Sequence, residues 1–336
     1  MSNNTPKGIK NFELNCYMSS LLQCLYYIPE LRNFFINNIE YFYKNDKYIC
    51  LSFAEIMYKY YYNNTKTVDI FAILRFKLLM GEKNKLFKGY GGDAKDLYFN
   101  FIDLILDELT IKQNQDESPT KDEMLNTIDK EKAFLESEKE VDENNIINKI
   151  FSGFYETSYK CAHNEELGFK TYSFTHETFI LFNLELISKH YNKDPLTIED
   201  CLKFNFNRSY SSSFYCNVCN IIEKNKAEDK IYKPPLILVL ILDRGHGKGF
   251  KGKVEFDLEL DLKDFIDEDK YKNNSKYYLM GVINHIGDSS LQGHYTACCL
   301  TDTKEFYFFN DEKVCKADQE LLKLGETYLL FYRRYK

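Results

Sequence analysis

Proline and glycine are scarce in this 336-residue sequence, with 6 and 15 residues respectively, and tryptophan is absent. So little of either residue excludes a collagen-like repeat and argues against a fully disordered chain. Hydrophobic residues make up 44% of the chain and aromatic residues 16%, which is enough to build a substantial core. The sequence therefore predicts a folded protein of about two ordinary domains or one larger, multi-lobed domain.

Long apolar runs are also missing. The longest uninterrupted run is Leu236–Leu242, far short of the roughly 20 residues that cross a bilayer, so we expect no membrane partner. The first residues do not combine a charged stretch with an apolar core, as a secretory signal does. We therefore expect a cytoplasmic or nuclear location.

The chain has no surplus of positive charge. It contains 51 acidic residues against 44 Lys+Arg, a net charge of -7. Because nucleic-acid binding needs a basic patch or stripe, we expect no nucleic-acid partner. Residues 111–145 carry 11 of the acids and only five lysines. We interpret this segment as an exposed acidic insertion, with one amphipathic helix around Ile128–Leu135.

The hydrophobic pattern divides the chain. Within 8–110, Leu21, Leu22 and Leu25 share one face of a helix that begins near Cys16 and stops before Pro29. From 146 to 336, short β-branched or aromatic runs between turn residues predict strands: Phe179–Leu186, Leu236–Leu242, Tyr277–Ile283, Tyr295–Leu300, Phe306–Asn310 and Thr327–Tyr332. Since Leu236–Leu242 has no polar alternation, we expect it to be buried on both faces. Helices followed by strands predict an α+β fold.

One cysteine stands in a position suited to catalysis. Cys16 lies at the predicted start of a helix, where free N–H groups and the helix dipole stabilise a thiolate. His294 enters a late strand, and Asn310 and Asp311 follow sixteen residues later, at the end of the next one. Adjacent antiparallel strands would bring this Asn/Asp pair beside the imidazole, as a thiol protease requires. With six histidines and ten cysteines a chance pairing stays open on spacing alone.

Five segments with distinctive local residue patterns follow one another along the chain. The first two precede the strands: a nucleophile segment, Gly8–Asn11 with Asn15–Gln23, and the start of a helix, Gly92–Leu97. The others are Pro234–Arg244, a histidine segment made of Tyr278–Gly287 and Gly293–Ala297, and its continuation through Phe309–Val314 to Tyr328–Tyr332. Together, in this order, they resemble the ubiquitin-specific protease family. The resemblance covers about residues 8 to 334, so we expect 1–336 to form one catalytic domain.

The resemblance implies a papain-like right hand with a helical thumb (about 8–110) and strands of the palm and fingers (146–336). It also implies a monomer that grips ubiquitin and cleaves the isopeptide or peptide bond after its C-terminal Gly-Gly. Carried over, Cys16 attacks, His294 acts as base and then as acid, and Asn310 orients the imidazole, with Asp311 as a second polar neighbour. Asn11 matches the side chain that binds the oxyanion.

The resemblance further implies where the tail of ubiquitin is read. The arginines of that tail suit the carboxylates of Asp93 and Asp96, although both acids also suit a helix start, where they complement the dipole. His285 would shape a loop or contact the tail. The segments Gly245–Lys253 and Ile286–Gly293 correspond to two loops that gate the site.

The family's chemistry needs no cofactor, but many relatives hold one structural zinc between two Cys-x-x-Cys pairs. Cys216 and Cys219 form one such pair, whereas the other keeps only Cys161, because Asn164 replaces its second cysteine. His163 could complete a Cys₃His set from one residue earlier. A site without metal is the other interpretation, and we slightly favour it.

Departures from the family pattern leave two alternatives open. Glu13, Leu14, Asn15 and Gly91 replace the residues usual before the nucleophile and before the thumb helix. The chain could therefore be a weak or inactive ubiquitin-binding pseudoenzyme, or a protease for another ubiquitin-like modifier. Because none of the replacements removes a catalytic group, we expect an active deubiquitinase.

Overall fold

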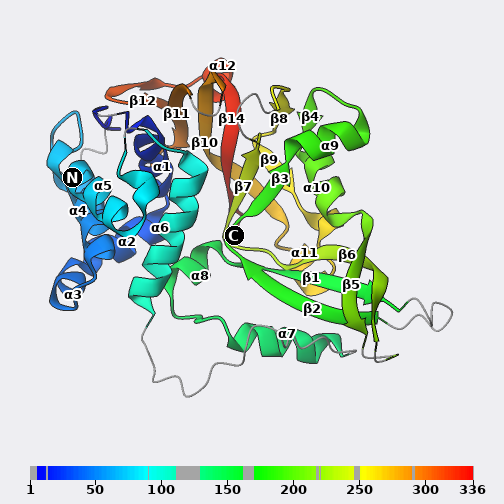
Figure 1. Ribbon diagram of the computed structural model, residues 1–336. Coiled ribbons are helices and arrows are strands. Elements are labelled where there is room, and N and C mark those ends of the chain that lie inside the picture. The colour runs from blue at the N-terminus through cyan, green and yellow to red at the C-terminus, as the bar shows by residue number, and fades with distance from the viewer. Residues whose placement is uncertain are drawn as a thin grey trace.

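The computed structural model describes residues 6–12, 14–89, 91–110, 129–161, 170–216, 219, 221–245, 250–289 and 292–335. As predicted, the fold is α+β and has the shape of a hand (Figure 1): blue and cyan helices form the thumb, brown and red strands the palm, and green strands the fingers. Among the described residues, no helix combines the length and apolar character that a membrane span needs.

The thumb is a cluster of helices around one apolar core. They are α1 (Cys16–Tyr26), α2 (Pro29–Asn37), α3 (Ile39–Lys44), α4 (Tyr48–Tyr62), α5 (Ile70–Lys83), the short η1 (Lys85–Phe87) and α6 (Ala94–Leu109). Every residue of α1 is buried, because this helix lies between the other thumb helices and the palm. Pro29 opens α2 at a position where its missing N–H costs nothing.

The palm is a twisted sheet with strand order β13-β12-β11-β10-β14-β7-β3, and β9 pairs with β10. Its strands are β3 (Ile180–Asn183), β7 (Ile237–Asp243), β9 (Glu259–Asp261), β10 (Lys276–Ser289), β11 (Gln292–Leu300), β12 (Phe306–Asn310), β13 (Lys313–Lys316) and β14 (Glu326–Arg334). Alternate residues of β7 enter two different cores, Val239 on the thumb side and Leu240 on the other. The predicted two-sided burial of this strand is therefore confirmed.

The fingers are a four-stranded sheet of order β2-β1-β6-β5. Its strands are β1 (Gly153–Lys160), β2 (Lys170–Glu177), β5 (Ser209–Cys216) and β6 (Ile221–Lys233). The remaining elements pack around the two sheets: α8 (Ile146–Phe151), α9 (Leu184–Tyr191), β4 (Leu196–Thr197), α10 (Ile198–Phe206), β8 (Val254–Glu255), η3 (Lys263–Phe265), α11 (Asp269–Lys272) and α12 (Gln319–Leu322).

The second part of the acidic segment is docked on the fingers rather than exposed. It forms α7 (Lys130–Lys139), which lies along β2 (Figure 1). Phe134 of α7 is buried, and the centre of its ring lies 4.4 Å from that of Tyr232. Lys130 forms an ion pair with Glu156 of β1 at 2.8 Å. Residues 111–128, with the first part of the segment, lie outside the described residues.

Two of the predicted boundaries are wrong. The run Phe179–Leu186 is a strand only through Asn183, whose side chain accepts a hydrogen bond from the N–H of Leu186 and so starts α9. The predicted gating loop Ile286–Gly293 is largely a continuation of β10 and β11, because the antiparallel ladder still pairs Ile286 with His294 and Ser289 with Gln292. The Gly245–Lys253 segment is described only at Gly245 and from 250 onward.

Candidate active site

The contact between α1 and the strands β11 and β12, called here the catalytic seam, brings three predicted residues together. Cys16 is the first residue of α1 and is 6% exposed. His294 lies on β11, and Asn310 is the last residue of β12. Residues that are almost 300 positions apart in the chain therefore meet, because the nucleophile's helix packs directly on the palm sheet.

The hydrogen bonds of His294 assign a role to each ring nitrogen. Its Nε2 lies 2.8 Å from Oδ1 of Asn310. Since an amide oxygen can only accept, Nε2–H is the donor, and Nδ1 is the nitrogen left for the hydrogen bond with Cys16. The hydrogen bonds with Cys16 and then Asn310 raise the pKa of His294 to about 9, against the effect of burial. The imidazole is thus charged at neutral pH.

Asp311 lies beside the imidazole but is not its nearest partner. Its Oδ2 is 3.6 Å from Nε2 of His294 and accepts a hydrogen bond from Nδ2 of Asn11 at 3.0 Å. Burial raises the pKa of this carboxyl group above its ordinary value. Asp311 therefore adds negative charge near the ring and holds Asn11, while Asn310 makes the direct contact.

The chain segment before Cys16 is fixed against the turn after β12. The N–H of Ile9 donates to the carbonyl of Asp311 at 3.0 Å. Gly8 allows this approach, because a Cβ atom there would lie 2.5 Å from the backbone of Glu312. Asn11 is held at both ends of its amide, since its Oδ1 also accepts from the N–H of Asn15 at 3.1 Å. One of the two Nδ2 hydrogens of Asn11 is used by Asp311, and among the described residues none accepts the other.

Asn15 has a role that the sequence did not reveal. Its side chain is fully buried, accepts from the N–H of Phe12 at 2.8 Å and donates to Oγ of Ser19 at 3.3 Å. Although Asn15 is the N-cap residue of α1, its side chain does not cap the helix. The side chain of Asn15 thus does not cap the N–H groups at the start of α1, beside Cys16. The preceding residue, Leu14, has a backbone φ of 57°, in the left-handed region. In the sequence, the only sign of this role is that Asn15 departs from the family pattern.

Asp93 and Asp96 occupy different environments. Asp93 is the N-cap of α6: its Oδ1 accepts from the N–H of Lys95 at 2.7 Å, and its Oδ2 accepts from the hydroxyl of Tyr328. Asp96 lies half-buried in the first turn of the same helix. Asp93 thus has the helix-start role that the sequence offered for both acids. In this position its carboxylate also lies beside the catalytic seam.

His285 is buried on β10 next to the seam. The centre of its ring lies 4.7 Å from that of Tyr295, and burial lowers the pKa of His285 below its ordinary value. Gly293, the residue before His294, packs against this ring. A Cβ atom at Gly293 would lie 2.2 Å from Nε2 of His285, so only glycine fits at this position. His285 is therefore a neutral, packed residue that supports the strand carrying the base.

Arg244 closes the base of the segment 245–253. Its guanidinium donates to the carbonyls of Phe250, at 3.2 Å, and Gly252, at 2.9 Å, and also to the carbonyl of Thr327 on β14. The side chain is buried, and burial lowers the pKa of Arg244. Arg244 thus ties the end of this segment to the palm, a role that its place in the sequence did not indicate.

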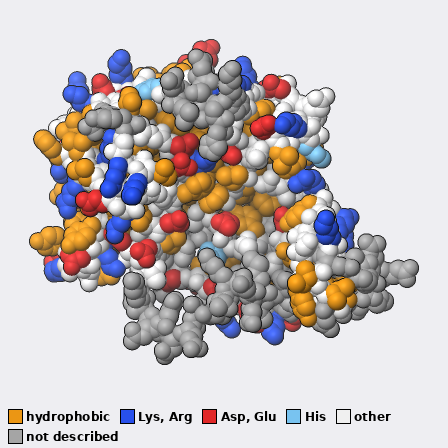
Figure 2. All heavy atoms as spheres, viewed as in Figure 1, with side chains coloured by type: hydrophobic (Ala, Val, Ile, Leu, Met, Phe, Trp, Pro, Cys, Tyr) orange, Lys and Arg blue, Asp and Glu red, His pale blue; other side chains and the backbone are white. Residues whose placement is uncertain are grey.

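The face between the thumb and the fingers carries the chemistry of a protein-binding surface. In Figure 2, acidic and hydrophobic side chains gather across the middle of this face. Apolar side chains that are rimmed by charge favour a large, basic partner over a small ligand.

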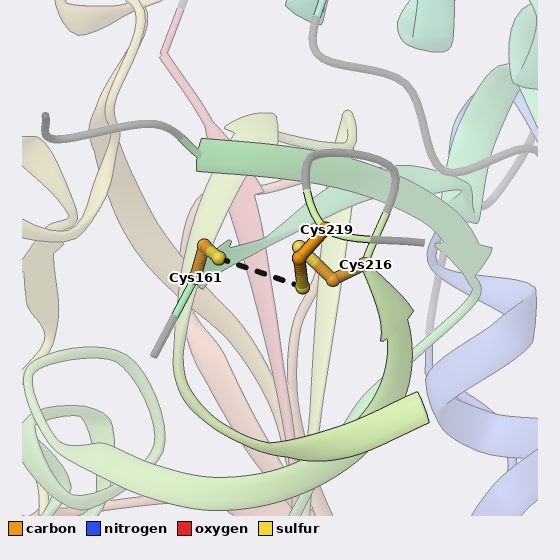
Figure 3. A group of neighbouring side chains, drawn as sticks. All are labelled: Cys161, Cys216 and Cys219. Carbon is orange, nitrogen blue, oxygen red and sulfur yellow. Dashed lines mark hydrogen bonds between the residues drawn. The ribbon is translucent and has the colours of Figure 1, made fainter. Parts of the chain in front are cut away.

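A second group of cysteines meets at the far end of the fingers, called here the finger tip. Cys161 follows β1, while Cys216 and Cys219 lie at the turn between β5 and β6 (Figure 3). Their three sulfur atoms lie within 4.8 Å of one another, and Cys161 and Cys219 are 3.8 Å apart. This group could hold a metal ion. His163, the predicted fourth ligand, lies outside the described residues.

The three thiols fit a tetrahedral zinc site. With Zn–S bonds of about 2.3 Å, two sulfurs of a tetrahedron lie about 3.8 Å apart, which matches Cys161 and Cys219. Burial, with the neighbouring Cys216 and Cys161, raises the pKa of Cys219 to about 11. A metal ion bound here would displace the proton of Cys219, because the thiolate is the form that binds metal.

Known proteins agree with this geometry. The chain is 27% identical to ubiquitin carboxyl-terminal hydrolase 4 of Arabidopsis thaliana, over 91% of this chain and 84% of that protein. It is 26% identical to ubiquitin carboxyl-terminal hydrolase 8 of Saccharomyces cerevisiae, over 97% of this chain and 70% of that protein.

Solved structures show the same fold. A SAGA DUB module with Ubp8, Sgf11, Sus1 and Sgf73, bound to ubiquitin aldehyde, contains a chain that matches with a TM-score of 0.75 and 22% identity. The match covers 100% of this chain and 70% of that one. The family profile described as ubiquitin carboxyl-terminal hydrolase matches residues 7–332, nearly the whole sequence. The chain therefore belongs to the ubiquitin carboxyl-terminal hydrolase family.

Proposed function

We propose that Cys16, His294 and Asn310 are the catalytic residues with which this chain hydrolyses the bond after the C-terminal glycine of ubiquitin. As a member of its family the chain is a cysteine-type deubiquitinase, and these three residues are proposed to supply the reacting atoms. The observation that carries it is the contact of His294 Nε2 with Oδ1 of Asn310 at 2.8 Å, together with the interaction with Cys16 that raises the pKa of the same imidazole.

The first half of the reaction forms a thioester. The Cys16 thiolate attacks the carbonyl carbon of ubiquitin's last glycine, and the carbonyl oxygen takes up the negative charge. His294, protonated on both nitrogens, donates its Nδ1 proton to the departing amine as the C–N bond breaks. Asn310 keeps the ring in the orientation that points Nδ1 at the reacting atoms throughout.

The second half returns the enzyme to its starting state. His294, now neutral with its proton on Nε2, removes a proton from water, which attacks the thioester carbon. The C–S bond then breaks and restores the thiolate and imidazolium, while ubiquitin leaves with a C-terminal carboxyl group that releases its proton to the solvent.

Asn11 stabilises the charge that develops on the carbonyl oxygen in both halves. The remaining Nδ2 hydrogen of Asn11 and the uncapped start of α1 are the donors that flank Cys16. Asn15 acts on Asn11 rather than on the substrate, because its N–H holds Oδ1 of Asn11 and its side chain fixes Phe12. It is a positioning residue.

Ubiquitin is the proposed partner, with Asp93 and Asp96 as the acids that read its tail. Solved relatives of this fold are bound to monoubiquitin and to ubiquitin aldehyde, and the middle of the face in Figure 2 is acidic and apolar. Since Oδ2 of Asp93 already binds the hydroxyl of Tyr328, a tail arginine would join or replace that hydroxyl.

At the finger tip we propose a structural zinc, held by Cys161, Cys216 and Cys219. The expectation of an empty site rested on Asn164, and the spacing of the three sulfurs now favours occupancy. The fourth ligand would come from outside the described residues, and His163 is the one that the sequence offers. Zinc would fasten the end of β1 to the β5–β6 turn and take no part in the chemistry.

The decisive experiment is reaction with a ubiquitin probe that carries an electrophile at its C-terminus, followed by intact mass and peptide mapping. One adduct on Cys16 is expected, and none on the Cys16→Ala protein. A parallel probe built on another ubiquitin-like modifier should react far more slowly. Faster reaction with that second probe would assign the enzyme to the other modifier, and no adduct with either would leave a binding protein.

Two broader expectations remain proposals. We infer a cytoplasmic or nuclear location, which fluorescence microscopy of the tagged chain would check. We also infer a monomer. Relatives such as Ubp8 occur in multi-subunit modules, so the mass of the purified chain should be measured by light scattering.

A further inference from the structure

Two side chains of the thumb cross to the palm from the start of α6. Asp93 accepts a hydrogen bond from Tyr328 of β14. Lys95, two residues later, places its Nζ 2.8 Å from Oδ1 of Asp243, the last residue of β7. The second contact joins full charges of the thumb and the palm, and the charges of Asp93 and Asp96 also act on Lys95.

The Lys95–Asp243 pair is largely shielded from water. The Lys95 side chain is 13% exposed and that of Asp243 is 22% exposed. Burial alone lowers the pKa of Lys95, but the hydrogen bond to Asp243 and the nearby Asp93 raise it above its ordinary value. Lys95 is therefore charged, and it neutralises one of several carboxylates in a confined region.

A guanidinium group suits the carboxylate of Asp243 better than the ammonium group of Lys95 does. An ammonium group meets a carboxylate as a point charge, whereas a guanidinium donates two parallel hydrogen bonds to both of its oxygens. Lys95 donates to Oδ1 of Asp243 at 2.8 Å. A guanidinium that reached Asp243 would thus bind it more strongly than Lys95 does.

We propose that Lys95 is an internal competitor that occupies Asp243 in the free enzyme and yields it to an arginine of ubiquitin's tail. This inference rests on the proposed function and deepens it. Asp243 becomes a third acid that selects the substrate, on the palm side, opposite Asp93 and Asp96 on the thumb. Lys95 sets how strongly the tail must compete.

Competition predicts that two variants at Lys95 change KM in opposite directions, whereas a merely structural tie does not predict this. Lys95→Met keeps the length of the side chain but frees Asp243, so KM should fall about three- to tenfold. Lys95→Arg keeps the tie and strengthens it, so KM should rise about threefold or more. If Lys95 only fastened thumb to palm, the methionine variant would be the worse enzyme and the arginine variant as good as the parent.

The experiment measures kcat and KM on ubiquitin with a C-terminal fluorophore, and on the same substrate with its tail arginine nearest Gly-Gly changed to alanine. The gain from Lys95→Met should disappear with the alanine substrate and in the double variant Lys95→Met, Asp243→Asn. Lys189→Met is the matched control, because it removes a lysine from an exposed ion pair on α9 and should leave KM unchanged.

Several outcomes would overturn the inference: an unchanged or higher KM in Lys95→Met, or an equal change with both substrates. If melting curves show that Lys95→Met is unfolded, Lys95→Arg decides alone, and a KM equal to the parent's rejects competition. The electrophilic ubiquitin probe separates this failure from a failure of the proposed function. If the parent protein forms the Cys16 adduct but the Lys95 variants change KM in the wrong direction, only the role of Lys95 is refuted.

Discussion

The catalytic seam and the finger tip both gather sulfur chemistry from distant parts of the chain, but different forces hold them. At the seam Cys16 belongs to the large core shared by the thumb and the palm. At the tip, the core formed by described residues contains Cys161, Phe214 and Cys216, with Tyr159 and Cys219 packed against them. We therefore expect the seam to be positioned by its own packing and the tip to depend on its three thiols.

The hydrogen bonds follow the same contrast. His294, Asn310, Asp311 and Asn11 form one connected network of side chains with contacts of 2.8 to 3.6 Å. At the tip, the sulfurs of Cys161 and Cys219 are 3.8 Å apart, and all three sulfurs lie within 4.8 Å of one another. Variants of the seam should therefore change turnover and leave stability nearly intact, while variants of the tip should do the reverse.

The largest expected effect is that of Cys16→Ala. Without the nucleophile, hydrolysis of ubiquitin with a C-terminal fluorophore should fall by at least about 10³-fold, as in other enzymes with covalent intermediates. Ubiquitin binding by calorimetry should persist, because the core around α1 tolerates the loss of one sulfur atom. Turnover near that of the parent would remove Cys16 from the mechanism.

Asn11→Ala tests the oxyanion site with the next largest effect. Loss of one such donor costs about 10²- to 10³-fold in kcat, with KM nearly unchanged. Asn45→Ala is the matched control, since Asn45 is exposed and its side chain donates to the nearby carbonyl of Tyr41. A fall in the melting temperature that matched the fall in kcat would show that Asn11 has only a structural role.

Asn310→Ala should lower kcat about tenfold and move the alkaline limb of its pH profile. The pKa of His294 is raised to about 9, with Asn310 as one of the causes, so the imidazolium persists below that pH and is lost above it. Removing the hydrogen bond lowers this pKa and shifts the limb toward neutral pH. If the limb stays in place, Asn310 does not set the charge of the base.

Neutralising Asp93 and Asp96 together should raise KM about tenfold for ubiquitin substrates, because charge-assisted contacts to the tail are lost. Asparagine is the replacement of choice, since it still caps α6 at position 93. Reaction of Cys16 with a small thiol reagent is the control and should be unaffected. Unchanged processing of ubiquitin would assign both acids to the helix start alone.

The smallest effect on turnover is expected at the finger tip. Purified protein should contain about one zinc per chain, and a strong chelator or Cys219→Ser should lower the melting temperature by a few degrees. Turnover at a temperature where the protein stays folded should change less than about twofold. Less than half an equivalent of zinc, with an unchanged melting temperature, would restore the expectation of an empty site.

Local residue order was sufficient to predict much of the seam. The start of α1 at Cys16 and the strand Phe306–Asn310 follow from hydrophobic period and turn residues, which act over short distances. The roles of Cys16, His294 and Asn310 came from the family resemblance. The two-sided burial of β7 was equally readable, because a strand inside two cores has no polar alternation. The family resemblance supplied the hand-shaped fold.

Contacts between distant segments could not be read in this way. The partners of Lys95, Asn15 and Arg244 lie in other elements or in tight loops, and no periodicity encodes such pairs. Likewise, the docking of α7 depends on the ring of Phe134 finding Tyr232 almost a hundred residues later. The sequence by itself determined which residues are candidates for the chemistry, because residue type sets what a side chain can do. Only the tertiary structure decided which of them meet, because packing sets distance, burial and charge.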